Sequence, residues 1–349
     1  MSNLKTLGKF GYTDTGSVAD SSDYTTVFLI HGFGFHGANF HKMLPFVSSS
    51  NARLVLINRR DFPGSEPYST SEVGQLKEML GAPSLVQFDN FMRERAKEIY
   101  EFVCAFVKQE SIPVANGHRG GVVLTSWSFG AVWLMAFMSN VGSFPVEDVD
   151  LTKYMRRAIL YDPPYICFGY PPPEDPYSAF SDESIEPQDR PEAFFKWVSG
   201  YYTHDFATGT LERRSPSTDV SSTVARMTPE EMQACVHADA AGAEGTDSKH
   251  FALGLATDLH SHLRRRVFFH DNGKDQQDHW DKLPIQYLWC DRSVWETPWG
   301  AGKLREELDS SEQAGKKHRD VQIVRFEGAN HFPHWDEPAR FLEYILREE

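Results

Sequence analysis

Leu124–Ala131, with the sequence LTSWSFGA, carries the strongest structural signal in the chain. It overlaps a short apolar run at 121–124 and precedes a long, helix-compatible apolar run at 132–138. A buried strand, a tight turn with small residues around a central Ser128, and a helix predict a nucleophile elbow. Ser126 replaces the usual first glycine, so the pattern is S-x-S-x-G, and serine is still small. The alternative is an ordinary strand-to-helix turn that contains serines.

A second strand-to-loop segment lies near the N-terminus. Residues 26–30 (TVFLI) predict a buried strand, which is followed by the loop His31–Gly34 (HGFG). A backbone N–H in such a loop can join the N–H of the residue after a nucleophile to form an oxyanion hole. We therefore predict Phe33 and Phe129 as the two oxyanion-hole donors.

A third segment lies near the C-terminus, where a strand predicted for 321–326 precedes Glu327–Pro333 (EGANHFP). A serine hydroxyl is a poor nucleophile at neutral pH and needs an adjacent base. His331 is the candidate for this general base, and it would later return the proton to the leaving group. His334 is a weaker alternative, because it lies three residues further along the chain.

Strand–HGFG, strand–SxSxG and strand–GxNH, in this order, resemble the α/β-hydrolase superfamily. The resemblance extends from about residue 25 to the C-terminus, apart from a long middle insert. It implies an α/β fold class, with a mainly parallel central sheet, helices on both faces, and a helical cap inserted between two core strands. It also implies a triad in which Ser128 is the nucleophile and His331 the base.

The remaining pattern alternates strands and helices, as expected for such a sheet. Apolar runs and helical spacing predict strands at 52–57, 158–161 and 285–289, and helices at 85–108 and 338–346. The region 163–281 shows no strand periodicity but contains aromatic residues at helical spacing. We therefore predict a first part of the hydrolase core over 1–162, a helical cap over 163–281, and a second part of the core over 282–349.

Two carboxylates compete to hold the imidazole in the tautomer that a triad requires. Asp162 directly follows the strand predicted before the cap, and the two prolines after it would make its backbone rigid. Asp291 follows the strand predicted after the cap, but the position that the resemblance implies for the acid holds Ser293. We favour Asp162 and keep Asp291 as the alternative acid.

The composition can build a large hydrophobic core and argues against several classes of partner. The formal net charge is −14 and no basic block occurs, which argues against nucleic acid and anionic membranes as partners. Four widely spaced cysteines favour a reduced, cytoplasmic protein, and residues 1–5 lack the apolar core of a signal peptide. No dinucleotide-binding glycine motif or metal-ligand spacing occurs, so we expect no cofactor and no metal.

A narrower resemblance is to the cofactor-free ring-cleaving dioxygenases of the 4-oxoquinaldine type, which share the α/β-hydrolase fold. It rests on Ser126–Ser128 (SWS), Leu160–Asp162 (LYD) and Asn330–Pro333 (NHFP). It implies a His/Asp pair that deprotonates an aromatic hydroxyl before dioxygen attacks the substrate anion. The chain departs from those enzymes in its longer cap and in its His-Gly loop.

We interpret the sequence as a serine hydrolase that cleaves an ester or lactone of a hydrophobic small molecule through an acyl-enzyme. Aromatic residues favour a flat or aromatic substrate, and we predict contacts from Trp127, Tyr165, Trp197 and Tyr201. The first alternative is a cofactor-free dioxygenase or carbon–carbon bond-cleaving enzyme that uses the His/Asp pair. The second is a small-molecule receptor on the same fold.

Overall fold

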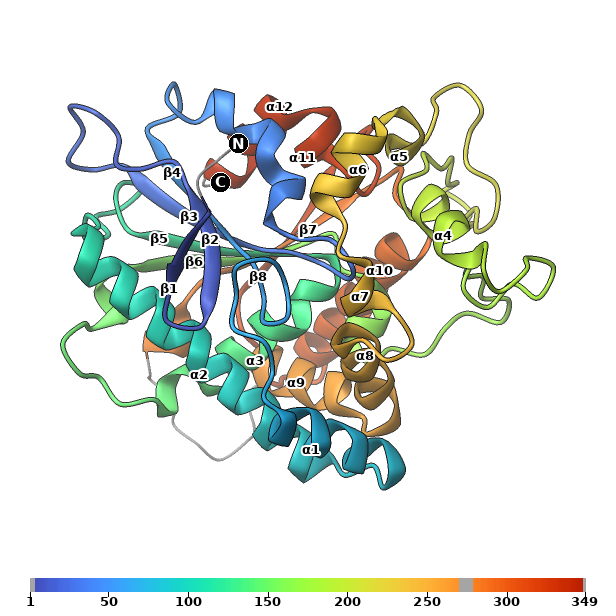
Figure 1. The fold of residues 1–349 in the computed structure, drawn as a ribbon, viewed down its shortest axis with the longest axis horizontal. Helices are drawn as coiled ribbons and strands as arrows, with labels where there is room; N and C mark the ends of the chain where they lie inside the picture. Colours follow the sequence, from blue (N-terminus) through green and yellow to red (C-terminus); the bar gives the residue numbers. More distant parts are fainter. Residues whose placement is uncertain (1–3, 270–278, 348–349) are drawn as a thin grey trace.

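A mainly parallel sheet forms the centre of the molecule in a computed structural model that describes residues 4–269 and 279–347. Its eight strands occur in the order β1-β2-β4-β3-β5-β6-β7-β8 (Figure 1). The strands from β4 to β8 in this order are parallel, while β1 and β2 form an antiparallel hairpin at one edge. The strands are β1 (Lys5–Leu7), β2 (Phe10–Asp14), β3 (Thr25–Ile30), β4 (Ala52–Ile57), β5 (Val122–Trp127), β6 (Met155–Tyr161), β7 (Ile285–Cys290) and β8 (Val321–Phe326).

The strand sequences explain why this sheet is the core. Every residue of β3, β4, β5 and β7 is buried, as expected for parallel strands covered on both faces. In β3, Phe28 and Ile30 belong to one hydrophobic cluster, whereas Val27 and Leu29 belong to the other, because side chains alternate across a strand. The prediction of a mainly parallel sheet with helices on both faces is confirmed.

Helices cover the two faces of the sheet. The first hydrophobic cluster contains apolar residues of α2 (Leu85–Glu110), α3 (Ala131–Asn140) and α10 (Glu296–Gln313). The second contains residues of the 3₁₀ segment η1 (Gly37–Phe46) and of α12 (Pro338–Leu346). The other helices are α1 (Thr70–Gly81), α4 (Arg190–Val198), α5 (Thr223–Arg226), α6 (Pro229–Cys235), α7 (Ala238–Ala241), α8 (Thr246–Ala256), α9 (Leu259–Phe268) and α11 (Pro333–Asp336).

The insert between β6 and β7 contains α4 to α9 and divides into two groups (Figure 1). Helices α8 and α9 pack against α1 and α3, and their apolar residues belong to the first hydrophobic cluster. Helices α4 to α6 lie on the opposite side, where α6 packs against η1. The helices agree with the cap predicted over 163–281, but its bounds stay a prediction and residues 270–278 lie outside the described ranges.

None of the helices in residues 4–269 and 279–347 combines the length and apolar character needed to cross a membrane.

A buried ion pair ties helix α8 of the insert to the core. Two guanidinium nitrogens of Arg59, in the loop after β4, contact the two carboxylate oxygens of Asp247 on α8 at 2.6 and 2.8 Å. Asp247 also accepts the backbone N–H of Gly34 at 3.1 Å. Both ionic side chains are almost fully buried, so removing one partner leaves an uncompensated charge away from water.

We expect Asp247→Ala to lower the free energy of unfolding by about 3–5 kcal/mol, because Arg59 would stay buried without its carboxylate. Chemical denaturation followed by circular dichroism measures this change. Glu101→Ala is the matched control, since it removes the exposed pair with Lys97 and should change stability by less than about 1 kcal/mol. Equal effects of the two substitutions would contradict a stabilising role for the buried pair.

Candidate active site

The turn at Ser128 has the backbone conformation of a strained elbow. Strand β5 ends at Trp127, Ser128 has a φ of 54°, and α3 begins at Ala131. A positive φ is costly for a residue with a side chain, and such strain collects at functional sites. Gly130 permits the close approach of this turn to the β3 loop, because a Cβ there would lie 2.6 Å from the carbonyl oxygen of His31.

Ser126, the departure from the glycine pattern, is fully buried in β5. Its hydroxyl oxygen has no hydrogen-bond partner among the described residues. The side chain therefore occupies the place of a glycine without taking part in the polar network described below.

His331 and Asp162 form the shortest polar contact of the site. Nδ1 of His331 lies 2.5 Å from Oδ2 of Asp162, and both side chains are buried. Asp162 directly follows β6 with a φ of 45° and also accepts hydrogen bonds from the backbone N–H of Cys290 at 2.8 Å and the hydroxyl of Ser293 at 2.7 Å. With Nδ1–H donated to the carboxylate, Nε2 is the ring nitrogen left to exchange a proton.

Ser293 therefore lies next to Asp162, the candidate acid, and is not itself the acid. The family resemblance implies a carboxylate at this point of the chain, and the serine hydroxyl instead donates to the carboxylate of Asp162 across the sheet.

Asp291, the alternative acid, contacts different partners. One of its carboxylate oxygens accepts from Nε and Nη2 of Arg325 at 3.0 and 2.7 Å, and the other accepts the backbone N–H of Gly328 at 2.6 Å. These contacts hold the end of β8 and the loop that follows it. The geometry therefore favours Asp162 over Asp291 as the partner of the imidazole.

Trp127 and His334 pack behind His331. The Trp127 ring contacts both imidazoles, with centroid distances of 4.9 and 4.8 Å, and its Nε1–H donates to the carbonyl of His331 at 3.0 Å. His334 is bound through Nε2 to Asn39 at 2.7 Å and through Nδ1 to Tyr161 at 2.9 Å. Burial holds the pKa of His334 well below its usual value, and His331 lowers it further. His334 is thus a neutral, fully engaged imidazole.

His31 stabilises the loop that carries Phe33. Its Nε2 accepts the backbone N–H of Arg59 at 2.9 Å, so Nδ1 carries the proton and donates to the carbonyl of Gly32 at 3.0 Å. Burial lowers the pKa of His31 well below the usual value, and the charge of Arg59 adds to this effect. The neutral ring therefore fixes the loop and is unavailable as a proton carrier near pH 7.

Ser128 and His331 both line a cavity of about 480 Å³. Its wall is rich in aromatic side chains: Phe33, Phe129, Phe180, Phe194 and Phe251. The Phe33 ring makes edge-to-face contacts with the other four, at centroid distances between 5.9 and 6.4 Å. Such a wall fits a flat apolar ligand.

Phe33 and Phe129 are the predicted oxyanion-hole donors, and their rings lie 5.9 Å apart in this wall beside Ser128. The contact brings the loop after β3 to the elbow after β5, as the prediction requires. The role of their two N–H groups stays a prediction.

The four aromatic residues that we expected at the substrate lie outside the cavity lining. Trp127 lies behind His331, and Tyr165 packs on Trp295 at a centroid distance of 5.2 Å. The polar tips of the other two are bound elsewhere: Trp197 donates to the carbonyl of Arg213 and Tyr201 to Asp336. Their buried N–H and O–H groups required partners, which directed them away from an apolar cavity.

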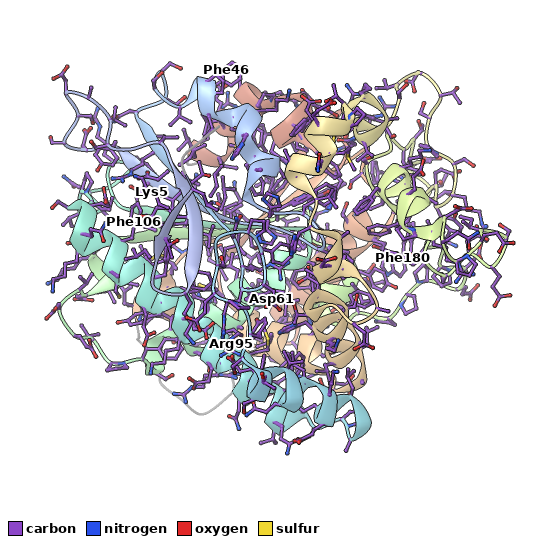
Figure 2. The ribbon with its side chains drawn as sticks, in the orientation of Figure 1. Lys5, Phe46, Asp61, Arg95, Phe106 and Phe180 are labelled. Atoms are coloured by element: carbon purple, nitrogen blue, oxygen red, sulfur yellow. The ribbon has the colours of Figure 1, made fainter. Side chains whose placement is uncertain are left out.

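Phe180, Phe194 and Phe251 line the cavity instead, and we did not predict these three residues from the sequence. Phe180 lies in the segment before α4, on the side of the molecule formed by the insert (Figure 2). Its ring stacks on that of Phe194 at 4.1 Å. Two ionisable side chains that we also did not predict, Arg190 and Glu296, belong to the same cavity wall.

Two polar side chains, one in the loop after β8 and one at the end of α11, bind to the insert. The Nδ2 group of Asn330 donates to the carbonyl of Ser199 and to the hydroxyl of Thr223, both at 2.7 Å. Asp336 accepts hydrogen bonds from Tyr201 at 2.7 Å and from Thr223 at 2.6 Å. The segment from the end of α4 to the start of α5 is therefore bound directly to the loop that carries His331 and to α11.

The described residues contain no group of three or more His, Cys, Asp or Glu side chains that could hold a metal ion.

Comparisons with known proteins identify the family. Residues 27–344 match the model of the "Alpha/beta hydrolase family", and the chain belongs to this family. Among solved structures, a bromoperoxidase from Bacillus anthracis is similar with a TM-score of 0.53 and 14% identity, covering 97% of this chain and 95% of the other. A laboratory-evolved variant of potato epoxide hydrolase gives a TM-score of 0.53 and 12% identity, with 99% and 97% covered. At these identities the structural likeness shows the fold alone.

No significant match was found among curated protein sequences.

We expect Asp162→Asn to slow the reaction of Ser128 with a fluorophosphonate by about 10³–10⁴-fold, because an amide no longer fixes the reactive tautomer of His331. Asp291→Asn removes the same charge from a different contact and should have a far smaller effect. Labelling rates measured by intact-protein mass spectrometry compare the two variants. The reverse order of effects would assign the acid to the loop after β7.

Proposed function

We propose that the protein is a serine hydrolase that cleaves an ester or lactone of a hydrophobic, flat or aromatic small molecule. The observation that carries this proposal is the 2.5 Å contact between His331 and Asp162, combined with the shared position of Ser128 and His331 in one aromatic cavity. A base oriented by a carboxylate, next to a serine on a strained turn, is the arrangement that activates a hydroxyl for acyl transfer.

The reaction proceeds in two halves. Ser128 Oγ attacks the carbonyl carbon of the ester while Nε2 of His331 accepts the hydroxyl proton, and Asp162 stabilises the imidazolium. The imidazolium then gives the proton to the leaving alkoxide, so that the alcohol departs and an acyl-Ser128 ester remains. In the second half, Nε2 of His331 removes a proton from water as the hydroxide attacks the acyl carbon. The bond to Ser128 Oγ then breaks, and the imidazolium returns the proton to this oxygen, which releases the acid and restores the serine hydroxyl.

The negative charge on the carbonyl oxygen needs donors in both halves. The N–H groups of Phe33 and Phe129 would supply them, because their residues meet beside Ser128. The aromatic wall contributes binding energy for the apolar part of the substrate and keeps water away from the charge that develops.

We expect Ser128→Ala to abolish ester hydrolysis and fluorophosphonate labelling while the fold survives, since only the attacking oxygen is removed. The loss should reach several orders of magnitude. Hydrolysis of a phenyl-ester panel, with peptide mapping of the labelled wild-type protein, measures both effects. Unchanged esterase activity in a folded Ser128→Ala variant would exclude the mechanism.

We expect turnover to continue under strict anaerobiosis and in excess chelator, because water is the second substrate of a hydrolase. In H₂¹⁸O, the product acid should carry the label, which mass spectrometry detects. If turnover instead stops without dioxygen, and label from ¹⁸O₂ enters the product, then the His331–Asp162 pair serves oxygen chemistry and the hydrolase proposal is wrong.

A further inference from the structure

A carboxyl group that the proposed mechanism does not use lies in the wall of the active-site cavity. Glu296 is the first residue of α10 and lines the cavity together with Ser128 and His331. It follows the loop after β7, in which Ser293 donates to Asp162. The same short stretch of chain therefore supports the acid of the site and brings a second carboxyl to the substrate.

Among the described residues, no cationic side chain contacts the carboxyl of Glu296, although its place in the first turn of α10 favours a negative charge. Within the described residues, no hydrogen bond or ion pair links its carboxyl to another group. The titratable groups that face it are Tyr165 and Cys167, before the insert helices, and Tyr202 within the insert. Burial raises the pKa of each of these three groups, so all are uncharged near pH 7.

Burial also raises the pKa of Glu296 to about 8. A carboxyl in this condition is mostly protonated at neutral pH, and a protonated carboxyl can donate a hydrogen bond through its O–H. The other charged or titratable side chains of the cavity wall are Arg190, whose Nε donates to the carbonyl of Ile185 at 3.0 Å, and His331, which is bound to Asp162.

We propose that Glu296 is a specificity-determining residue that donates a hydrogen bond, as an uncharged acid, to a second oxygen of the substrate. The inference rests on the proposed function and narrows its substrate class. The substrate is then an apolar ester or lactone that also bears a carbonyl, ether or hydroxyl oxygen away from the scissile bond. In a wall that is largely apolar, a donor of this kind favours one orientation of the ligand.

The alternative occupant is a substrate ammonium group, which would bind Glu296 as a carboxylate. The cavity wall offers Arg190 as its fixed charge, and this cation disfavours a second positive charge in the same space. The observations therefore favour a neutral oxygen acceptor.

The test uses phenyl esters that differ only in the remote group. One series carries a ketone at varied positions of the acyl chain, the second has a methyl-branched carbon in place of each ketone, and the third has a terminal ammonium group. A parallel set places the same groups in the alcohol half. For the best-placed ketone, we expect the wild-type kcat/KM to exceed that of the branched analogue by about tenfold.

Two substitutions of Glu296 separate donor from charge. Glu296→Gln keeps an N–H donor and should retain most of this preference, whereas Glu296→Leu should abolish it. Glu306→Gln and Glu306→Leu, on an exposed position of the same helix, are the matched controls. A preference that survives in Glu296→Leu, no preference in the wild type, or a preference for the ammonium ester that Glu296→Gln removes would each overturn the inference.

The pH dependence gives an independent signature. The donating form of Glu296 is present below its pKa and lost above it, so KM for the keto ester should rise as pH increases through about 8. Glu296→Gln should show no such rise, because the amide does not titrate. An identical KM profile in the two proteins contradicts the assignment of the donor.

Binding to a Ser128→Ala background keeps this inference separate from the proposed function. Calorimetry of the same keto and branched esters measures their relative affinity without turnover. A keto preference in binding, without hydrolysis of any ester by the wild type, leaves Glu296 as a recognition group and rejects the hydrolase. Hydrolysis without a keto preference rejects the role of Glu296 alone.

Discussion

The hydrogen bond between His331 and Asp162 is the interaction on which the rest of the site depends. It joins residues 169 positions apart, and it requires β6 and β8 to end at the same edge of the sheet. Parallel strands produce this convergence, because all their carboxyl ends point in one direction. Ser128 reaches the same edge from β5, through a turn whose positive φ lifts the serine away from the strand. The topology of the sheet therefore determines where the three candidate catalytic groups meet.

Elements with a continuous apolar run or a regular apolar stripe were predictable from the sequence, and elements with small or polar contacts were not. The buried strand β4 and the amphipathic helix α12 match their predicted bounds for this reason. Strand β8 also matches its predicted bounds, although only Phe326 in it is buried. Helix α10 escaped prediction because part of its buried side consists of small or polar residues, such as Thr297, Gly300 and Ala301. The three-residue strand β1 is too short to show a period.

The candidate site likewise contains residues that the sequence predicts and residues that it does not. Ser128, Asp162 and His331 stand at the ends of predicted strands, so the sequence order already indicates that they meet. The aromatic cavity wall comes from irregular segments and short helices of the insert, where spacing along the chain says little about direction. Glu296 could have been singled out only as an acid just beyond the loop after β7, a signal shared by many exposed residues.

The contacts of Asn330 and Asp336 have a consequence for how a substrate enters. These side chains bind the segment from the end of α4 to the start of α5 to the loop that carries His331 and to α11. An opening motion that lifted this segment away would break these hydrogen bonds and disturb the position of His331. On this side of the cavity, substrate entry and the placement of His331 are therefore coupled.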